Sequence, residues 1–301
     1  MELDLSRPLV MGIVNASPDS FSDVGVGHTV DARVDRALAA LDAGADLLDV
    51  GGQSGITGVP EIAEQEEVDR VVPVVRGILA ARPDAVISVD TYRPAVTRAV
   101  LDAGAAIVND VSCLLHEDVA VACGEAGAAL VVMHTKARPK HRLQDPDAYD
   151  DVVGEVTAVL RDRLARAREL GVAAEGTIVD PGVDYAKTPA QTIALLRGLE
   201  PIRALGRPIL WALSRKDFVG ALTGRPPQER GAGTLAAIAH VGTAPGSIFR
   251  VHDVAATVDH LAVARALAGE VAVPADLHLD DRLRWADGRA GEVAAARAGG
   301  S

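Results

Sequence analysis

The chain has 301 residues, of which 49% are hydrophobic and 3% aromatic, so it can bury a large aliphatic core in one alternating α/β domain or two smaller domains. Its 30 basic and 42 acidic residues give a formal net charge of -12, which argues against general nucleic-acid binding because it would repel a phosphate backbone. Two cysteines, Cys113 and Cys123, are too few for a disulfide framework. No apolar run reaches the roughly 18 residues of a membrane span and no leader-like segment stands at Met1, so we expect a soluble, cytoplasmic protein with no membrane partner.

Short, nearly uniformly apolar runs alternate with helix-like segments along the chain. The runs lie at residues 8–15, 47–52, 85–91, 105–112, 128–135, 176–182, 207–214 and 246–253. Uniform apolarity, in place of strict alternation, is typical of parallel strands that are buried on both faces. Between the runs, apolar residues recur at helical spacing at 31–43, 61–81, 95–104, 152–170 and 190–205.

This alternation predicts a single closed (β/α)₈ barrel, the TIM barrel of the α/β class, over residues 1–270. A doubly wound open sheet is the alternative, but it usually carries a glycine-rich dinucleotide fingerprint after its first strand, and residues 14–23 contain nothing of that kind. The G-x-G-x-x-A match at 231–236 follows a polar run instead of a strand, so we regard it as chance. Residues 271–301 form a tail that we expect to be a frayed helix and a partly disordered end.

In a barrel, the residues that follow each strand share one rim, where barrel enzymes hold their active sites. Candidate site residues stand at these strand ends: Asn15, Asp90, Asn109, Met133, Asp180, Lys216, Arg250 and His252. The carboxylates of Asp90 and Asp180 with the carboxamide of Asn109 suit a planar heterocycle that carries amino, imino and carbonyl groups. Lys216 could donate to a carbonyl or ring nitrogen of such a ring, although a solvated lysine is an equal alternative when the residue is read alone.

The segment "FRVHD", residues 249–253, is the clearest anion signal in the chain. Arg250 and His252 are separated by one residue, so in an extended strand they project to the same side and can hold a phosphate together. Asn15 can add a neutral ligand for phosphate oxygens or for an accompanying Mg²⁺. The alternative is an ion pair between Arg250 and a barrel carboxylate, with His252 as a helix cap. For Asp110 and Asp253, helix capping is the better interpretation.

Eight motifs occur in order along the chain: "MGIVNASPDSFSD", "DVGG", "ISVDTYRPAV", "AAIVNDVS", "VVMHT", "IVDPG", "ALSRKDFVG" and "FRVHDV". Together they resemble dihydropteroate synthase over residues 8–268. The resemblance implies a (β/α)₈ barrel that joins 6-hydroxymethyl-7,8-dihydropterin diphosphate to p-aminobenzoate in folate synthesis and releases diphosphate with Mg²⁺. It also implies a homodimer.

The same resemblance implies a role for each candidate residue. A pterin pocket would consist of Asp90, Asn109, Met133, Asp180 and Lys216. Asn15, Arg250 and His252 would hold the diphosphate and its metal. Among these, we expect Asp90, Lys216, Arg250 and His252 to be catalytic, because charge builds on the leaving diphosphate and on the pterin methylene as their bond breaks.

The departures from the family pattern fall on the side of the second substrate. After "DVGG", where the family has Glu-Ser-Thr-Arg-Pro-Gly, this chain has the uncharged segment 53–58, with Gly55 in place of threonine and Ile56 in place of arginine. Asp217 stands where the family usually has a serine near the aminobenzoate carboxylate, and we expect it to repel that group. Further departures, expected near the rim or narrowing the pocket, are Asp184, Ala186, Trp211 and Ala212.

Three functions are compatible with an intact pterin half and a remodelled second half. The first, which we take as the function, is a dihydropteroate synthase-like transferase that uses p-aminobenzoate or a related amine. The second is a relative with a different nucleophile in specialised metabolism, and the third is a pterin-binding paralogue with little catalysis and a regulatory or partner-binding role. Methyl transfer to a corrinoid uses a similar barrel, but "FRVHD" and "SRK" favour the branch that handles diphosphate.

The uncharged loop yields a prediction about rate. Losing one charge-stabilising contact to a leaving group typically costs about 10²–10³ in rate, so we expect this protein to form dihydropteroate far more slowly than an ordinary member of the family. Gly55→Thr with Ile56→Arg should raise diphosphate release. Release is measured as free diphosphate from the pterin diphosphate. Wild-type turnover of p-aminobenzoate at an ordinary rate, a few per second or above on the usual scale, would contradict this prediction.

Overall fold

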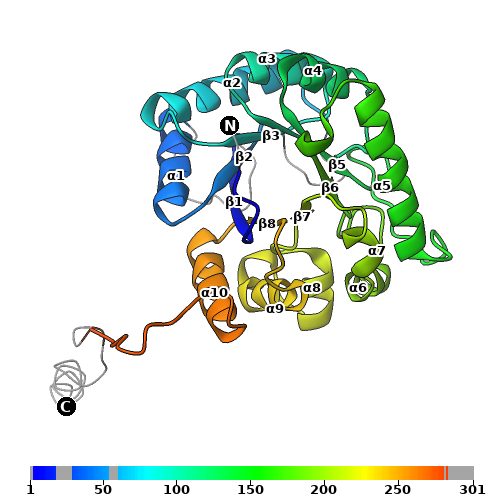
Figure 1. The fold of residues 1–301 in the computed structure, drawn as a ribbon. Helices are drawn as coiled ribbons and strands as arrows, with labels where there is room; N and C mark the ends of the chain where they lie inside the picture. Colours follow the sequence, from blue (N-terminus) through cyan, green and yellow to red (C-terminus); the bar gives the residue numbers. More distant parts are fainter. Residues whose placement is uncertain (1–2, 18–28, 54–59, 281–282, 284–301) are drawn as a thin grey trace, which may run out of the picture. The chain divides into compact units, whose positions relative to one another are not determined.

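The computed structural model describes residues 3–17, 29–53, 60–280 and 283, and the structural statements below refer to these residues. The chain divides into two compact units, Met1–Ala262 and Val263–Ser301. Within the first unit, eight parallel strands close into a barrel in the order β1 to β8, with β8 paired to β1 (Figure 1). The prediction of a single (β/α)₈ barrel is therefore confirmed, and the open-sheet alternative is excluded.

Each strand lies inside one of the predicted apolar runs. The strands are β1 (Leu9–Asn15), β2 (Leu47–Gly51), β3 (Ile87–Asp90), β4 (Ile107–Asp110), β5 (Ala129–Met133), β6 (Thr177–Asp180), β7 (Ile209–Trp211) and β8 (Ser247–Val251). They are largely apolar because one face packs inside the barrel and the other packs against the surrounding helices, and their polar residues stand mainly toward the carboxyl ends.

The helices follow the strands around the outside of the ring (Figure 1). They are α1 (Val30–Asp42), α2 (Glu64–Ala81), α3 (Pro94–Asp102), α4 (Asp118–Ala126), α5 (Val152–Glu169), α6 (Pro189–Arg197), α7 (Glu200–Arg203), α8 (Asp217–Thr223), α9 (Gly231–Val241) and α10 (Val254–Leu267). The segment predicted as one helix at 190–205 is two helices, because Gly198 ends α6 and Pro201 occupies the first turn of α7. No helix among the described residues is both long and apolar enough to span a membrane.

The predicted tail is covered only in part. Residues 271–280 contain neither helix nor strand, and apart from Leu283 the remainder of the tail lies outside the described residues. The predicted boundary at 270 stays a prediction.

The barrel interior is filled at one level by apolar side chains from the strands or from the residues just before them. This layer consists of Leu9, Met11, Leu47, Val86, Ile107, Val131, Ile178, Leu210 and Ile248. Alternate residues of a strand point to the same face, so the residue two positions later also faces inward, nearer the carboxyl end of the barrel. The apolar layer is thus the floor on which the next inward-facing residues stand.

Outside this layer, the strands pack against the helices. Trp211 is 1% exposed and belongs to a cluster with Phe249 of β8, Leu195 of α6 and Ile238 of α9. Neither Trp211 nor Ala212 is among the residues that line the cavity described below. The prediction that Trp211 narrows the pocket is therefore wrong, because an indole on this face fills the core between strands and helices. Ala212 stands two residues after the floor residue Leu210, and its effect on the pocket stays a prediction.

Candidate active site

A polar layer lies above the apolar floor, at the carboxyl ends of the strands. Each residue of this layer stands two positions after a floor residue. The residues are Asp49, Asn109, Met133, Asp180 and Arg250, and the floor residues before them are Leu47, Ile107, Val131, Ile178 and Ile248, in the same order. Asp49, Asn109, Met133 and Asp180 are each at most 2% exposed. Strand register places Asn15 beside Gly51, Gly51 beside Asp90 and Asp90 beside Asn109. The structure thus brings most of the predicted site residues to one end of the barrel.

Asp49 is the centre of this layer, and it was not among the predicted site residues. Its carboxylate accepts hydrogen bonds from Ser88 Oγ at 2.6 Å, Asn109 Nδ2 at 3.1 Å and Arg250 Nε at 2.6 Å. Arg250 Nη2 also donates to Asp90 Oδ2 at 3.1 Å. The signal for Asp49 is its two-residue spacing from Leu47, which places both side chains inside the barrel.

Arg250 and His252 point to different partners. Arg250 forms ion pairs with Asp49 and Asp90, which is the alternative considered from the sequence. His252 lies beyond the end of β8, where strand alternation no longer applies, and its Nδ1 is 2.9 Å from Ser214 Oγ. The shared grip on a phosphate therefore stays a prediction.

The two residues interpreted as helix caps differ. Asp253 Oδ1 accepts from the backbone N–H of Ala256 at 3.1 Å, so it caps the first turn of α10 and that prediction is confirmed. Asp110 accepts instead from the backbone N–H and the hydroxyl of Ser112, at 2.6 and 2.5 Å. The capping interpretation is wrong for Asp110, because it stabilises the turn after β4 while α4 begins only at Asp118.

Asp180, Lys216 and Tyr185 form another side of the site. Asp180 Oδ1 accepts from the Gly182 N–H at 2.7 Å, and burial raises the pKa of this carboxyl above its ordinary value. Lys216 Nζ lies 4.4 Å from the centre of the Tyr185 ring. Burial lowers the pKa of Lys216, while Asp184 and Asp180 oppose that shift. Asp184 accepts from the N–H of Phe218 at 3.2 Å, so the departure at this position fixes the start of α8.

The β6–α6 loop that carries Tyr185 is held by a buried lysine. Lys187 Nζ donates to the carbonyls of Gly182 and Tyr185, at 2.9 and 3.1 Å, and lies 3.0 Å from His134 Nδ1. Burial lowers the pKa of His134 to about 3, so its ring is neutral and Nδ1 can accept. Gly182 has a φ of +69° and a Cβ there would lie 1.9 Å from the His134 carbonyl oxygen, so only glycine fits. Sequence reasoning missed Lys187 because nothing in the local pattern shows that this lysine is buried or that it lies beside His134, which comes from another loop.

A cavity of about 480 Å³ opens beside these groups. One wall contains Asp90, Tyr185 and Lys216, and another is the β5–α5 segment 137–144. Gln53 lies on the side of β2, where its Oε1 accepts from the N–H of Ile62 at 3.3 Å. The remaining remodelled residues, 54–58, lie outside the described residues.

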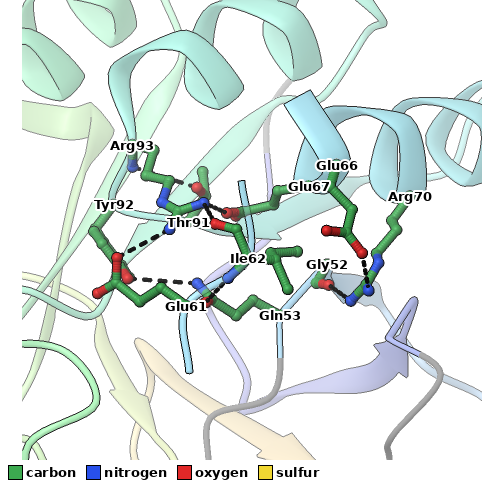
Figure 2. Close-up of polar contacts among 10 residues, drawn as sticks. All are labelled: Gly52, Gln53, Glu61, Ile62, Glu66, Glu67, Arg70, Thr91, Tyr92 and Arg93. Carbon is green, nitrogen blue, oxygen red and sulfur yellow. Dashed lines mark hydrogen bonds and ion pairs between the residues drawn. The ribbon is translucent and has the colours of Figure 1, made fainter. Parts of the chain in front are cut away.

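A hydrogen bond anchors the chain before residues 54–59, and ion pairs anchor it after them (Figure 2). Arg70 of α2 donates to the carbonyl of Gly52 at 3.2 Å. Arg93 pairs with Glu61 at 3.0 Å and with the buried Glu67 at 3.1 Å, and it also donates to the Ile62 carbonyl at 2.8 Å. The start of α2 is thus fixed to the end of β3.

Comparison with known proteins identifies the family. A family described as "Pterin binding enzyme" matches residues 11–252. The chain belongs to the dihydropteroate synthase family of pterin-binding enzymes. The dihydropteroate synthase of Escherichia coli is 39% identical over 264 residues, which cover 88% of this chain and 93% of that protein.

Solved structures of this family share the fold. The Xanthomonas albilineans dihydropteroate synthase with 4-aminobenzoic acid has a TM-score of 0.81 and 41% identity, covering 90% of this chain and 96% of that chain. The same enzyme in complex with 7,8-dihydropteroate has a TM-score of 0.78 and 41% identity, covering 90% and 97%. The resemblance seen in the sequence is therefore confirmed.

The charge state of Asp90 yields a pH prediction. Burial raises the pKa of Asp90 to about 7, with Arg250 opposing the shift and Asp49 adding to it. The ionised carboxylate accepts from a pterin N–H more strongly than the neutral acid does, so affinity for 6-hydroxymethylpterin should rise as pH increases from 6 to 8, by at most about tenfold per pH unit below the pKa. Titration calorimetry measures this, and Asp90→Asn should flatten the profile. An affinity that does not change with pH in the wild type, or an unchanged slope in the variant, would refute the assignment.

Proposed function

We propose that this dihydropteroate synthase-like transferase joins 6-hydroxymethyl-7,8-dihydropterin diphosphate to p-aminobenzoate or a related amine and releases diphosphate. Family membership and the shared barrel support the class of reaction. Solved relatives hold 4-aminobenzoic acid or 7,8-dihydropteroate, which are a substrate and a product of this chemistry. Residues at the barrel mouth supply a site for the pterin and a site for the diphosphate.

One observation carries the pterin half of the proposal. Within the described part of the chain, Asn109 Oδ1 is buried and accepts no hydrogen bond, although Asn109 Nδ2 is held by Asp49. A buried acceptor left without a donor costs about 1–3 kcal/mol, so such an atom at a barrel mouth points to a ligand that supplies an N–H. The amino and imino groups of a pterin supply such donors, and Asp90 and Asp180 can accept from others.

The diphosphate half rests on Asn15, Arg250 and His252. Among the described residues, no group of three or more His, Cys, Asp or Glu side chains is placed to hold a metal ion. The donors therefore fit a Mg²⁺ held mainly by diphosphate oxygens, as Mg²⁺ commonly is, with Asn15 as a neutral protein ligand. When bound, the ion would offset charge that builds on the leaving group.

In the reaction, the bond between the pterin methylene and the diphosphate oxygen breaks, and its electron pair leaves with the diphosphate. The Arg250 guanidinium would stabilise the departing charge, and the Asp90 carboxylate would stabilise the positive charge left on the methylene carbon. The amine lone pair then forms the C–N bond, and the nitrogen loses a proton. Because Arg250 already pairs with Asp49 and Asp90, the guanidinium is oriented before the substrate arrives.

The negative charge of Asp217 is weaker evidence for a nucleophile other than p-aminobenzoate once the surroundings of this residue are considered. The residue lines the cavity, but its carboxylate pairs with Arg230 Nη1 at 3.0 Å and its side chain is 65% exposed. Solvent and the guanidinium both weaken its repulsion of a substrate carboxylate. We therefore keep p-aminobenzoate as the first candidate. The Mg²⁺ requirement, the homodimer and the cytoplasmic location stay predictions.

A product assay tests the proposal. Purified protein with the pterin diphosphate, Mg²⁺ and p-aminobenzoate should form dihydropteroate and free diphosphate in equal amounts. Asp180→Asn should weaken pterin binding about tenfold or more, because it removes a charged acceptor at a buried ring. Asp46→Asn, at the amino end of β2, is the matched control. Diphosphate release without dihydropteroate would favour another nucleophile, and pterin binding without either product would favour a non-catalytic paralogue.

A further inference from the structure

The β5–α5 segment contributes a basic wall to the cavity that sequence reasoning did not include in the site. Arg138, Lys140, His141 and Arg142 all line the cavity, within a chain whose net charge is -12. We propose that this segment binds the acidic group of the amine co-substrate and so selects an aromatic amino acid over an uncharged aromatic amine. This inference rests on the proposed function and adds the residues that determine its co-substrate.

The position of the segment in the barrel separates it from the predicted diphosphate site. The strands close in the order β1 to β8, so the end of β5 lies across the mouth from the end of β1. Asn15 is the last residue of β1, Arg250 lies in β8, and His252 is the residue just after β8. A single diphosphate held on the β1 and β8 side leaves the β5 wall for a different anion.

Two guanidinium groups of the wall are available to such an anion. Among the described residues, neither Arg138 nor Arg142 forms an ion pair with a carboxylate, and Arg142 Nη2 donates only to the uncharged Gln144, at 2.6 Å. Both side chains belong to exposed residues at the cavity rim. By contrast, Lys136 at the start of the segment is paired with Glu155. A substrate carboxylate can therefore pair with Arg138 and Arg142 without breaking an ion pair that either arginine already makes.

The backbone holds the wall in a defined shape. Thr135 Oγ1 accepts from the Ala137 N–H at 3.1 Å, and His141 Nδ1 lies 3.0 Å from the Pro139 carbonyl oxygen. Lys140 adopts a φ of +66°, a left-handed conformation that is uncommon for a lysine. Strained residues of this kind are found where the surrounding structure fixes them, often at binding sites. The turn therefore presents the wall to the cavity before a ligand binds.

The cavity lining contains charges of both signs, distributed over three sides. Carboxylates of Asp90 and Glu67 stand on the β3 and α2 side, and the basic wall stands on the β5 side. On the β6 and β7 side, acidic and basic residues stand together: Asp184, Arg215, Lys216 and Asp217. The charge of Lys140 and the charge of Asp90 stabilise each other across the cavity. An amine with an acidic substituent fits this arrangement with its nitrogen toward the pterin end at Asp90 and its acid toward Arg138 and Arg142.

The test compares the binding of 4-aminobenzoate with that of 4-aminobenzamide, which has the same shape without the charge. Titration calorimetry is done on the full chain with Mg²⁺ and pyrophosphate, which stands for the leaving group and cannot react. The wild type should bind the acid about tenfold or more tightly than the amide, as expected for a charge-assisted contact. Arg138→Gln with Arg142→Gln should reduce that preference to about twofold or less while amide binding stays the same.

A matched control removes two charges elsewhere. Arg161→Gln with Arg168→Gln changes two exposed arginines of α5, and this variant should keep the wild-type preference. The inference is overturned if the wild type shows no preference, including the case in which neither ligand binds, if the Arg138 and Arg142 variant keeps the preference, or if that variant loses acid and amide binding equally. Because the comparison requires no turnover, its failure is distinct from failure of the proposed function, which shows as absent products.

Discussion

The buried ion pair between Asp49 and Arg250 is the interaction on which the barrel mouth depends. Asp49 is fully buried, so its charge is tolerated only because Ser88, Asn109 and Arg250 all donate to it. These donors come from β3, β4 and β8, and Arg250 extends the network to Asp90 at the end of β3. One carboxylate on β2 thereby orients side chains from three other strands, and the site is organised before a ligand arrives.

The stability of the barrel and its chemistry come from the same periodicity. Inward-facing residues alternate along each strand, so an apolar residue such as Ile107 or Ile248 closes the floor and the next inward residue, Asn109 or Arg250, enters the site. The apolar floor excludes water from beneath the polar layer, which strengthens hydrogen bonds and ion pairs above it. Loops then complete the mouth, and Lys187 fixes the loop that carries Tyr185.

The sequence alone predicted the barrel and most of the strand-end residues, because both depend on local pattern. Uniformly apolar runs marked all eight strands, and polar residues at their ends marked the rim. What it missed depends on contacts between distant segments. Asp49 is held by residues of three other strands, and Lys187 is buried beside His134, which comes from another loop. Trp211 was misplaced because strand alternation, and not side-chain size, decides which face a residue occupies.

The side of the site that faces the amine co-substrate contains charged residues that the family pattern does not include. The ion pair with Arg230 weakens the repulsion that Asp217 exerts on an acidic co-substrate. The basic wall at Arg138 and Arg142 favours such a co-substrate, even though Ile56 replaces the arginine expected in the β2–α2 loop. The pterin site thus keeps the family's residue types, whereas the co-substrate site departs from them.

The central claim is that Asp49 organises the pterin site, and it is tested most directly by the affinity of Asp49→Asn for 6-hydroxymethylpterin. Asp46→Asn, just before the same strand, is the control, and a thermal melt of each variant shows that it is folded. The account predicts that Asp49→Asn stays folded but binds about tenfold or more weakly, because Arg250 and Asn109 lose the charged acceptor that orients them. A folded Asp49→Asn variant with wild-type affinity would contradict it.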